Sequence, residues 1–278
     1  MSRKIKIEKN SVQETLIIPL YARKKCSDKF PALYQDPMAS EICGRIDYDF
    51  SVLDRKYEST AYEFGAMEGA LRQMDMMYEI RDYLKGHPDA PIVCMGCGLD
   101  FDSRRCGGAN NRIFNLDFPD VIAAREELAE KDPRETNIAT DLTDLSWMDK
   151  TDADGGAVFY ASGVFHYLKK EDVKKIALAI AERFPGSRLL FDTVGKLGYR
   201  LMMKAVLKTH KMKDFGDLFH TEDAVKDFSG WSDQIRVTVR GYMLGYFDMK
   251  APGVRGIHRL LAKVGDNVMK MQIVRMDM

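Results

Sequence analysis

The chain has 278 residues, which is long enough for one large domain or for a domain with a sizeable cap. Hydrophobic residues make up 45% and charged residues 30%, ordinary values for a globular protein with a full core. Lysine plus arginine total 42, as do aspartate plus glutamate. This balance gives no electrostatic reason to expect a nucleic acid or an anionic membrane as a partner.

The N-terminal sequence and the cysteine count indicate a cytoplasmic protein. The basic start is not followed by a long apolar segment with a cleavage site, and the apolar stretch 16–22 contains Pro19 and is too short to span a bilayer. Five cysteines, an odd number in a chain of this length, argue against a disulfide framework and fit a reducing compartment.

Residues 1–88 are predicted to form a helical N-terminal cap. A short helix is expected to begin with Asp36 as its N-cap and Pro37 in its first turn. A long helix follows from about Asp54 to Gly86, because apolar residues recur there at spacings of three and four. Gly86 and Pro88 then end the helix.

Residues 89–278 alternate β-rich and helical segments, which predicts a doubly wound, mostly parallel α/β sheet of the Rossmann-like type. Helices are expected between the strands, at 119–131 and 171–184, and an insertion on the substrate side at about 195–230. Two further strands, at 235–244 and 267–277, with a short helix between them, indicate an antiparallel edge at the C-terminus. The strands expected before them are 92–95, 112–116, 136–140, 157–161 and 188–192.

Gly96, Cys97 and Gly98 follow the first of these strands, where ligands bind in an open α/β sheet. Glycine lets a ligand approach the backbone closely, although two glycines after a strand often serve only a tight turn. Asp117 ends the second strand, about twenty residues later, where an acid typically accepts both hydroxyls of a ribose. The alternative is that Asp117 only caps the next helix.

Asp141 and Leu142 end the third strand, where an acid and an apolar side chain suit an adenine ring; a helix cap or turn is the alternative. A dinucleotide fingerprint needs a third glycine, but Phe101 stands at that position. Asp100 and Asp102 would also repel a pyrophosphate. A ligand with a ribose and no phosphate, such as S-adenosylmethionine, fits the loop better.

Cys94 and Cys97 form a CxxC, but the second ligand pair of a zinc site is lacking. A redox CxxC opens a helix, whereas Cys94 lies inside an apolar run. We therefore interpret both cysteines as packing residues and expect no metal.

Several ordered motifs resemble one family over most of the chain. They are "TLIIPLYARKKCSDKFPALYQDPMASEIC", "GALRQMDMMYEIRDYL", "GCGLDFDSRR", "NLDFPDV", "ATDLTDLSW", "ASGVFHYLKKEDV" and "RGYMLGY" with the C-terminal "LLAKVGDNVMKMQIVRMD". Together they are similar to the leucine carboxyl methyltransferase superfamily, and within it to the polyketide-synthesis O-methyltransferases of the TcmP type. The sequence departs from the family pattern at Phe101, where Thr is common. Ser162, where the leucine carboxyl methyltransferases carry an acid, favours the TcmP-type subgroup.

The resemblance implies a class I S-adenosylmethionine-dependent methyltransferase fold with S-adenosyl-L-methionine as cofactor. Arg72 would bind the methionine carboxylate of the cofactor with help from Arg23, as a planar guanidinium grips a carboxylate bidentately. The alternative for Arg72 is a surface ion pair with Glu68 or Asp75 on the same helix. The full cofactor-binding set would be Arg23, Arg72, Gly96, Cys97, Gly98, Asp117, Phe118, Asp141, Leu142 and Ser162.

Methyl transfer to a carboxylate requires no base, whereas a phenol benefits from one. His166, after the fourth strand, is the candidate base, and Tyr167, His210 and His220 are candidates for the acceptor pocket; the alternative for each is a structural role. Three functions stay open: methylation of a small, possibly polyketide-like acid or phenol, methylation of a protein C-terminus, and binding without catalysis. The oligomeric state is not predicted.

Overall fold

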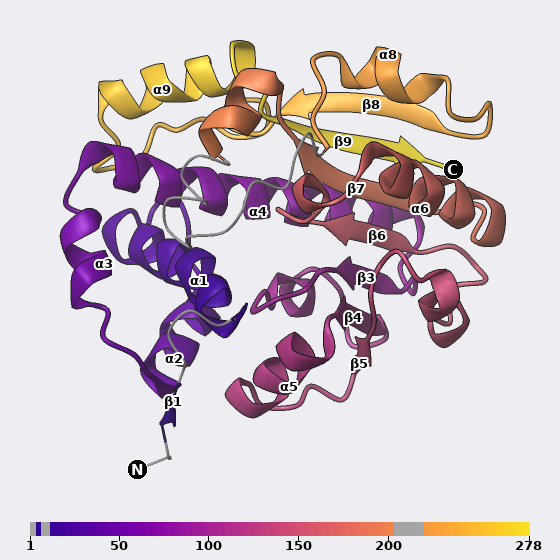
Figure 1. Cartoon of the computed structure of the whole chain (residues 1–278), viewed down its shortest axis with the longest axis horizontal. Helices are drawn as coiled ribbons and strands as arrows, with labels where there is room; N and C mark the ends of the chain where they lie inside the picture. Colours follow the sequence, from indigo (N-terminus) through magenta and orange to yellow (C-terminus); the bar gives the residue numbers. More distant parts are fainter. Residues whose placement is uncertain (1–3, 7–11, 203–218) are drawn as a thin grey trace.

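Seven strands of the computed structural model, which describes residues 4–6, 12–202 and 219–278, form one sheet (Figure 1). Their spatial order is β5-β4-β3-β6-β7-β9-β8, and neighbours pair in parallel except for β9, which is antiparallel to β7 and β8. This confirms the predicted doubly wound, mostly parallel sheet. The strands are β3 (Ile92–Met95), β4 (Ile113–Asp117), β5 (Glu135–Ala139), β6 (Val158–Ala161), β7 (Arg188–Thr193), β8 (Arg236–Gly241) and β9 (Gln272–Asp277).

The two C-terminal strands form the predicted antiparallel edge of the sheet, and the C-terminal strand β9 lies inside β8. It pairs on both sides, and Figure 1 shows its arrow pointing against that of β8. Ile273, Val274 and Met276 are buried, which suits a strand with neighbours on each side. The edge falls to β8, where Arg236 is exposed. Charged side chains on an edge strand discourage pairing with another chain.

Helices cover both faces of the sheet. Successive residues of β3 point to opposite faces: Ile92 and Cys94 belong to the core shared with α4, and Val93 and Met95 to the core shared with α6. The helices include α1 (Val12–Lys29), α2 (Pro37–Arg45), α3 (Ser51–Lys56), α4 (Thr60–Gly86), α5 (Pro119–Leu128), α6 (Lys170–Arg183), α8 (Ala224–Ser229) and α9 (Gly256–Asn267). The shorter elements include strands β1 (Ile5–Lys6) and β2 (Ile46–Asp47), and 3₁₀ turns η1 (Asp102–Arg105), η2 (Leu145–Lys150) and η3 (Phe165–Tyr167).

The N-terminal helices begin where side chains cap them. Asp36 accepts a hydrogen bond from the Ala39 N–H at 2.9 Å, which confirms the predicted N-cap of α2. The predicted single helix from Asp54 is wrong at its start, because α3 ends at Lys56 and a new helix, α4, begins after Ser59. The Ser59 hydroxyl accepts from the Tyr62 N–H and so caps this second helix. The apolar spacing alone does not mark this interruption.

Helices α1, α2 and α3 lie beyond the end of the sheet toward which the parallel strands point (Figure 1). Helix α1 packs on α4 and also contacts α5, while α4 contacts β6, β7 and β9. The N-terminal helices therefore lie over the carboxyl ends of the strands, although the cap boundary at residue 88 stays a prediction. Within the described residues, no helix combines the length and the apolar character needed to cross a bilayer.

Asp75 of α4 is a buried carboxyl group without a hydrogen-bond partner in the described part of the chain. Burial, with smaller contributions from Asp266 and Glu79, raises its pKa to about 9. Between the ordinary aspartate pKa and about pH 9 the folded state thus binds more protons than the unfolded state, and stability falls as pH rises. Asp75→Asn is expected to raise the free energy of unfolding by about 3 kcal/mol near pH 8 and to change it little near pH 4.

Asp82, on the same helix, is the matched control. Arg188 overcomes the effect of partial burial and lowers the Asp82 pKa, so Asp82→Asn should destabilise the protein at neutral pH. Urea unfolding at several pH values measures both variants. If the gain in the free energy of unfolding of Asp75→Asn did not grow with pH, the raised pKa of Asp75 would be contradicted.

Candidate functional site

The loop after β3 brings its glycines against the ends of β4 and β6. Gly96 and Gly98 have φ of +69° and +46°, a region that favours glycine. The N–H groups of Gly96 and Cys97 donate to the Leu116 carbonyl at 2.8 and 3.0 Å. A Cβ on Gly96 would collide with the Val164 side chain. The glycines are therefore required by the turn itself, at the switch point where strand order reverses between β3 and its neighbours.

Asp117, the last residue of β4, is fixed by backbone donors. Its Oδ2 accepts from the Gly98 N–H at 2.7 Å, and its Oδ1 accepts from the Phe118 N–H at 2.8 Å. Phe118 is the N-cap residue of α5 and has no capping side chain, so Asp117 does not serve as the cap that was its alternative role. Burial raises the Asp117 pKa, against the effect of the two N–H groups. The carboxylate is thus held at the glycine loop with Phe118, 53% exposed, beside it.

Asp141 and Leu142 follow β5 and, like the glycine loop and Asp117, lie at the carboxyl ends of the parallel strands. Asp141 Oδ1 accepts from the N–H and the hydroxyl of Thr143 at 2.9 and 2.8 Å, so the turn predicted as its alternative role is present. The Asp141 side chain remains exposed, whereas Leu142 is buried in the core and its carbonyl accepts from Trp147. The adenine-binding role of the two residues stays a prediction.

Arg72 of α4 reaches the ends of β6 and β7. Its Nη1 lies 3.1 Å from Asp192 Oδ2 and 3.8 Å from Glu68 Oε1, while Asp75, the other expected partner, makes no contact with it. Asp192 was not singled out in the sequence. The Arg72 Nε and the Ser162 Oγ are buried without a hydrogen-bond partner among the described residues. Unpaired buried polar atoms are costly unless a ligand uses them.

The arrangement of these residues fits a ligand with a ribose and a carboxylate. An acid beside the glycine loop suits a diol, and a guanidinium at the neighbouring strand ends suits a carboxylate.

Comparison with known proteins supports a methyltransferase fold. No protein-family model matches the chain. The tetracenomycin polyketide synthesis O-methyltransferase TcmP of Streptomyces glaucescens is 27% identical over 189 residues, 68% of each chain. The chain resembles the TcmP-type polyketide O-methyltransferases. The S-adenosyl-L-methionine-dependent methyltransferase dpfgK of Gibberella zeae is 24% identical over 213 residues, 71% of each chain.

Solved structures agree on the fold. A DUF574 family protein from Streptomyces avermitilis has a TM-score of 0.60 at 12% identity, with 95% of this chain and 96% of that chain covered. A proposed methyltransferase from Thermobifida fusca has a TM-score of 0.56 at 13% identity, with 86% and 92% covered. The fold is that of the class I S-adenosylmethionine-dependent methyltransferases.

Arg23, the second basic residue expected at the cofactor of this TcmP-like fold, is buried within the protein. Its Nε donates to Asp36 at 2.9 Å, and its Nη2 donates to the Leu99 carbonyl at 2.7 Å. Arg23 therefore ties α1 and the start of α2 to the glycine loop. A contact with the cofactor carboxylate stays a prediction.

The residues predicted for catalysis and for the acceptor pocket lie in different environments. His166 is 2% exposed, and its Nε2 lies 3.0 Å from Asp192 Oδ2, so it is held inside the protein. Tyr167 is 50% exposed. His220 is half-buried and stacks on Tyr199 at 5.2 Å between ring centroids. His210 lies outside the described residues.

Phe101, at the missing third glycine, has a packing role that the sequence analysis did not predict. The ring is buried, with the guanidinium of Arg125 at 3.9 Å from its centroid and that of Arg104 at 4.8 Å. Arg125 also donates to the carbonyls of Gly98, at 3.2 Å, and Asp100. The sequence could have indicated that Arg125 is buried, because this residue falls on the apolar face of the predicted helix 119–131.

The CxxC cysteines are buried free thiols. Burial raises the pKa of Cys97 to about 12 and that of Cys94 well above its ordinary value. Both redox and metal chemistry need the thiolate, which these surroundings disfavour.

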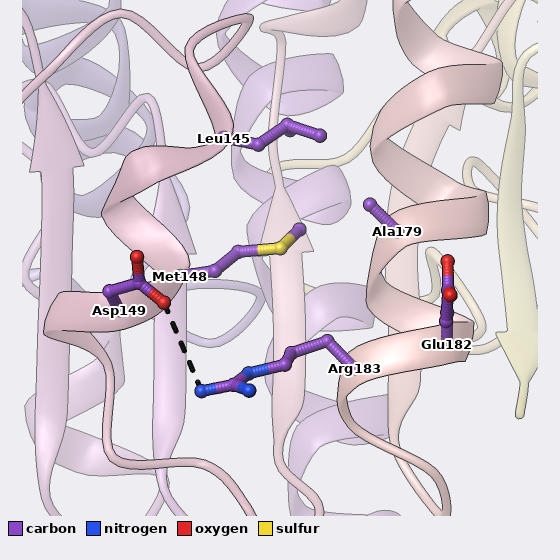
Figure 2. A pocket seen from close by; sticks show the side chains of 6 residues that line it. All are labelled: Leu145, Met148, Asp149, Ala179, Glu182 and Arg183. Carbon is purple, nitrogen blue, oxygen red and sulfur yellow. Dashed lines mark ion pairs between the residues drawn. The ribbon is translucent and has the colours of Figure 1, made fainter.

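A surface hollow of about 350 Å³ lies between η2 and α6 (Figure 2), and no residue of the glycine loop lines it. Arg183 and Asp149 face each other across it at 3.9 Å. A second hollow, of about 480 Å³, is lined by N-terminal residues including Lys25 and Asp54. Neither contains a predicted site residue. At the glycine loop itself, Val164 lies against Gly96, and Leu16 of α1 lies close to Gly98.

Proposed function

We propose that the chain is an S-adenosylmethionine-dependent O-methyltransferase that methylates a hydroxyl or carboxylate of a small, polyketide-like molecule. The observation that carries this proposal is the Asp117 carboxylate, which the Gly98 N–H holds beside a glycine turn at the switch point of the sheet. A ribose diol suits this acceptor, and the loop offers no glycine-rich cradle for a pyrophosphate. The names of the relatives TcmP and dpfgK support the reaction class.

In this proposal the described residues bind the cofactor along one edge of the sheet. Gly96, Cys97 and Gly98 lie under the nucleoside, Asp117 accepts the ribose hydroxyls, and Arg72 binds the methionine carboxylate. The rest of the proposed cofactor site is formed by Asp141, Leu142, Phe118 and Ser162. Arg23 supports the glycine loop through the Leu99 carbonyl. The bound cofactor supplies a methyl group on a sulfonium.

The protein contributes chiefly by aligning the acceptor, since effective molarities of well-oriented reactants reach roughly 10⁵ M. A carboxylate acceptor is already ionised near neutral pH, whereas a phenol, with a pKa of about 10, gains from a base. We retain His166 as the proposed base for a phenol and Tyr167 and His220 as pocket residues. We also place the enzyme in the cytoplasm, because its five cysteines are free thiols.

Calorimetric titration tests the cofactor assignment. S-adenosylmethionine should bind and NAD should not. Binding of NAD without binding of S-adenosylmethionine would contradict the proposal. A methyl-transfer screen over small acids, phenols and C-terminal peptides then identifies the acceptor. Turnover on peptides alone would replace the small-molecule proposal with protein carboxyl methylation.

A further inference from the structure

Asp192, the fifth residue of β7, joins three elements that meet at the carboxyl ends of β6 and β7. It is 1% exposed. Its Oδ1 accepts from the Gly163 N–H at 2.6 Å, and its Oδ2 lies 3.0 Å from His166 Nε2 and 3.1 Å from Arg72 Nη1. The carboxylate is therefore held by the loop after β6, by η3 and by α4.

Asp192 is ionised in this arrangement. Burial by itself would raise its pKa, but Arg72, His166 and the Gly163 N–H outweigh burial and hold the pKa well below its usual range. A carboxylate only accepts hydrogen bonds, so His166 Nε2 carries the hydrogen that lies between the two side chains.

The guanidinium of Arg72 uses only one corner in these contacts. Nη1 faces Asp192 and Glu68, whereas Nε and Nη2 donate to no side chain or carbonyl of the described residues. Nε and Nη2 form the side edge of the guanidinium, which is one of the forks that bind a carboxylate through two parallel hydrogen bonds. Arg72 Nη2 would lie 3.0 Å from a Cβ on Gly163, whose φ is +72°. Glycine at this position thus lets the guanidinium lie close to the backbone.

We infer that Asp192 is a positioning residue: it holds the Nη1 corner of Arg72 so that the Nε–Nη2 edge is presented to the carboxylate of the cofactor's methionine portion. This inference rests on the proposed function. His166 and the Gly163 N–H support Asp192, and so the burial of His166 has a reason that does not require it to take a proton. The buried, unpaired Ser162 hydroxyl lies next to Gly163 in the chain and adds a polar group at the same strand end.

A purely Coulombic role for Asp192 predicts a different outcome. A carboxylate near Arg72 would be repelled by Asp192, so removing the negative charge would strengthen binding of a plain anion. The methionine portion is a zwitterion, and Asp192 attracts its ammonium group while repelling its carboxylate. These effects oppose each other, and the geometric restraint on Arg72 decides the result.

Two ligands separate the positioning role from a general structural one. S-adenosylhomocysteine carries the amino-acid portion, and 5′-methylthioadenosine keeps the adenosine and the sulfur but lacks that portion. Calorimetry on Asp192→Asn should show S-adenosylhomocysteine binding weakened roughly tenfold or more, with methylthioadenosine changed less than about threefold. In an Arg72→Lys background, where the fork is already lost, Asp192→Asn should produce little further loss.

Asp266→Asn is the matched control, because Asp266 is likewise a carboxylate held by hydrogen bonds, from the Met243 and Leu244 N–H groups, but does not contact Arg72. It should preserve the ratio of the two affinities. Where Asp192→Asn does not fold, Asp192→Glu replaces it, since the extra methylene displaces the carboxylate and with it Arg72. Equal weakening of both ligands, or tighter S-adenosylhomocysteine binding, would overturn the inference. A wild-type protein that binds neither ligand would instead overturn the proposed function.

Discussion

Asp117→Ala is expected to abolish cofactor binding. The substitution removes the acceptor proposed for the ribose hydroxyls and also frees the Gly98 N–H, which donates to Asp117 at 2.7 Å. Each hydrogen bond to a charged acceptor contributes about 1.5–3 kcal/mol. Losing two to the ribose should therefore weaken S-adenosylhomocysteine binding at least about a hundredfold in calorimetry.

Asp120→Ala provides the control, because Asp120 is exposed in the first turn of α5 and should leave the affinity unchanged. Asp117→Asn adds a finer test. Its amide oxygen can accept from one backbone N–H, so this variant should be folded as stably as wild type to within about 2 kcal/mol while binding the cofactor weakly. Unchanged affinity in Asp117→Ala would refute the ribose role.

The sheet could be predicted from the sequence because its strands are short apolar runs between helical segments. Ile92–Met95 and Arg188–Thr193 are buried at every position, as parallel strands covered on both faces should be. The position of β9 could not be predicted, since the same period-two pattern fits an edge strand or a strand inserted between two others. The interruption before α4 was missed because a serine N-cap is visible only once the helix start is known.

The site could be predicted only in part, because some of its contacts join residues that are far apart in the sequence. The glycine loop and Asp117 follow successive strands, and strand ends meet at one edge whatever the details of packing. The pair of Arg72 and Asp192 joins residues 120 positions apart, and neither residue type at its position predicts the other. Phe101 stands where a third glycine is missing in the sequence, whereas in space its ring lies against Arg104 of the adjoining turn η1 and Arg125 of α5.

The contacts of Arg125 lead to the second large expected effect. Its side chain is 1% exposed, covers Phe101, pairs with Glu135 at 3.1 Å and donates to the carbonyls of Gly98 and Asp100. Arg125→Met keeps most of the volume but leaves those buried carbonyls without their donor. Glu135 keeps its ion pair with Arg104 at 2.6 Å. The free energy of unfolding, measured with urea, should therefore fall by about 3 kcal/mol, a moderate loss for a buried ion pair.

Arg45→Met is the control for Arg125→Met. Arg45 pairs with Glu41 and Glu130 at the surface, where an ion pair contributes about 0–1 kcal/mol. Arg125 binds carbonyl groups of the glycine loop, and Asp117 binds an N–H group of the same loop. Arg125→Met should therefore also weaken S-adenosylhomocysteine binding. Saturating ligand should in turn restore part of the lost stability of this variant. A destabilisation no larger than that of Arg45→Met would show that the guanidinium is not what holds the glycine loop, and Phe101 would then be left to do so by packing alone.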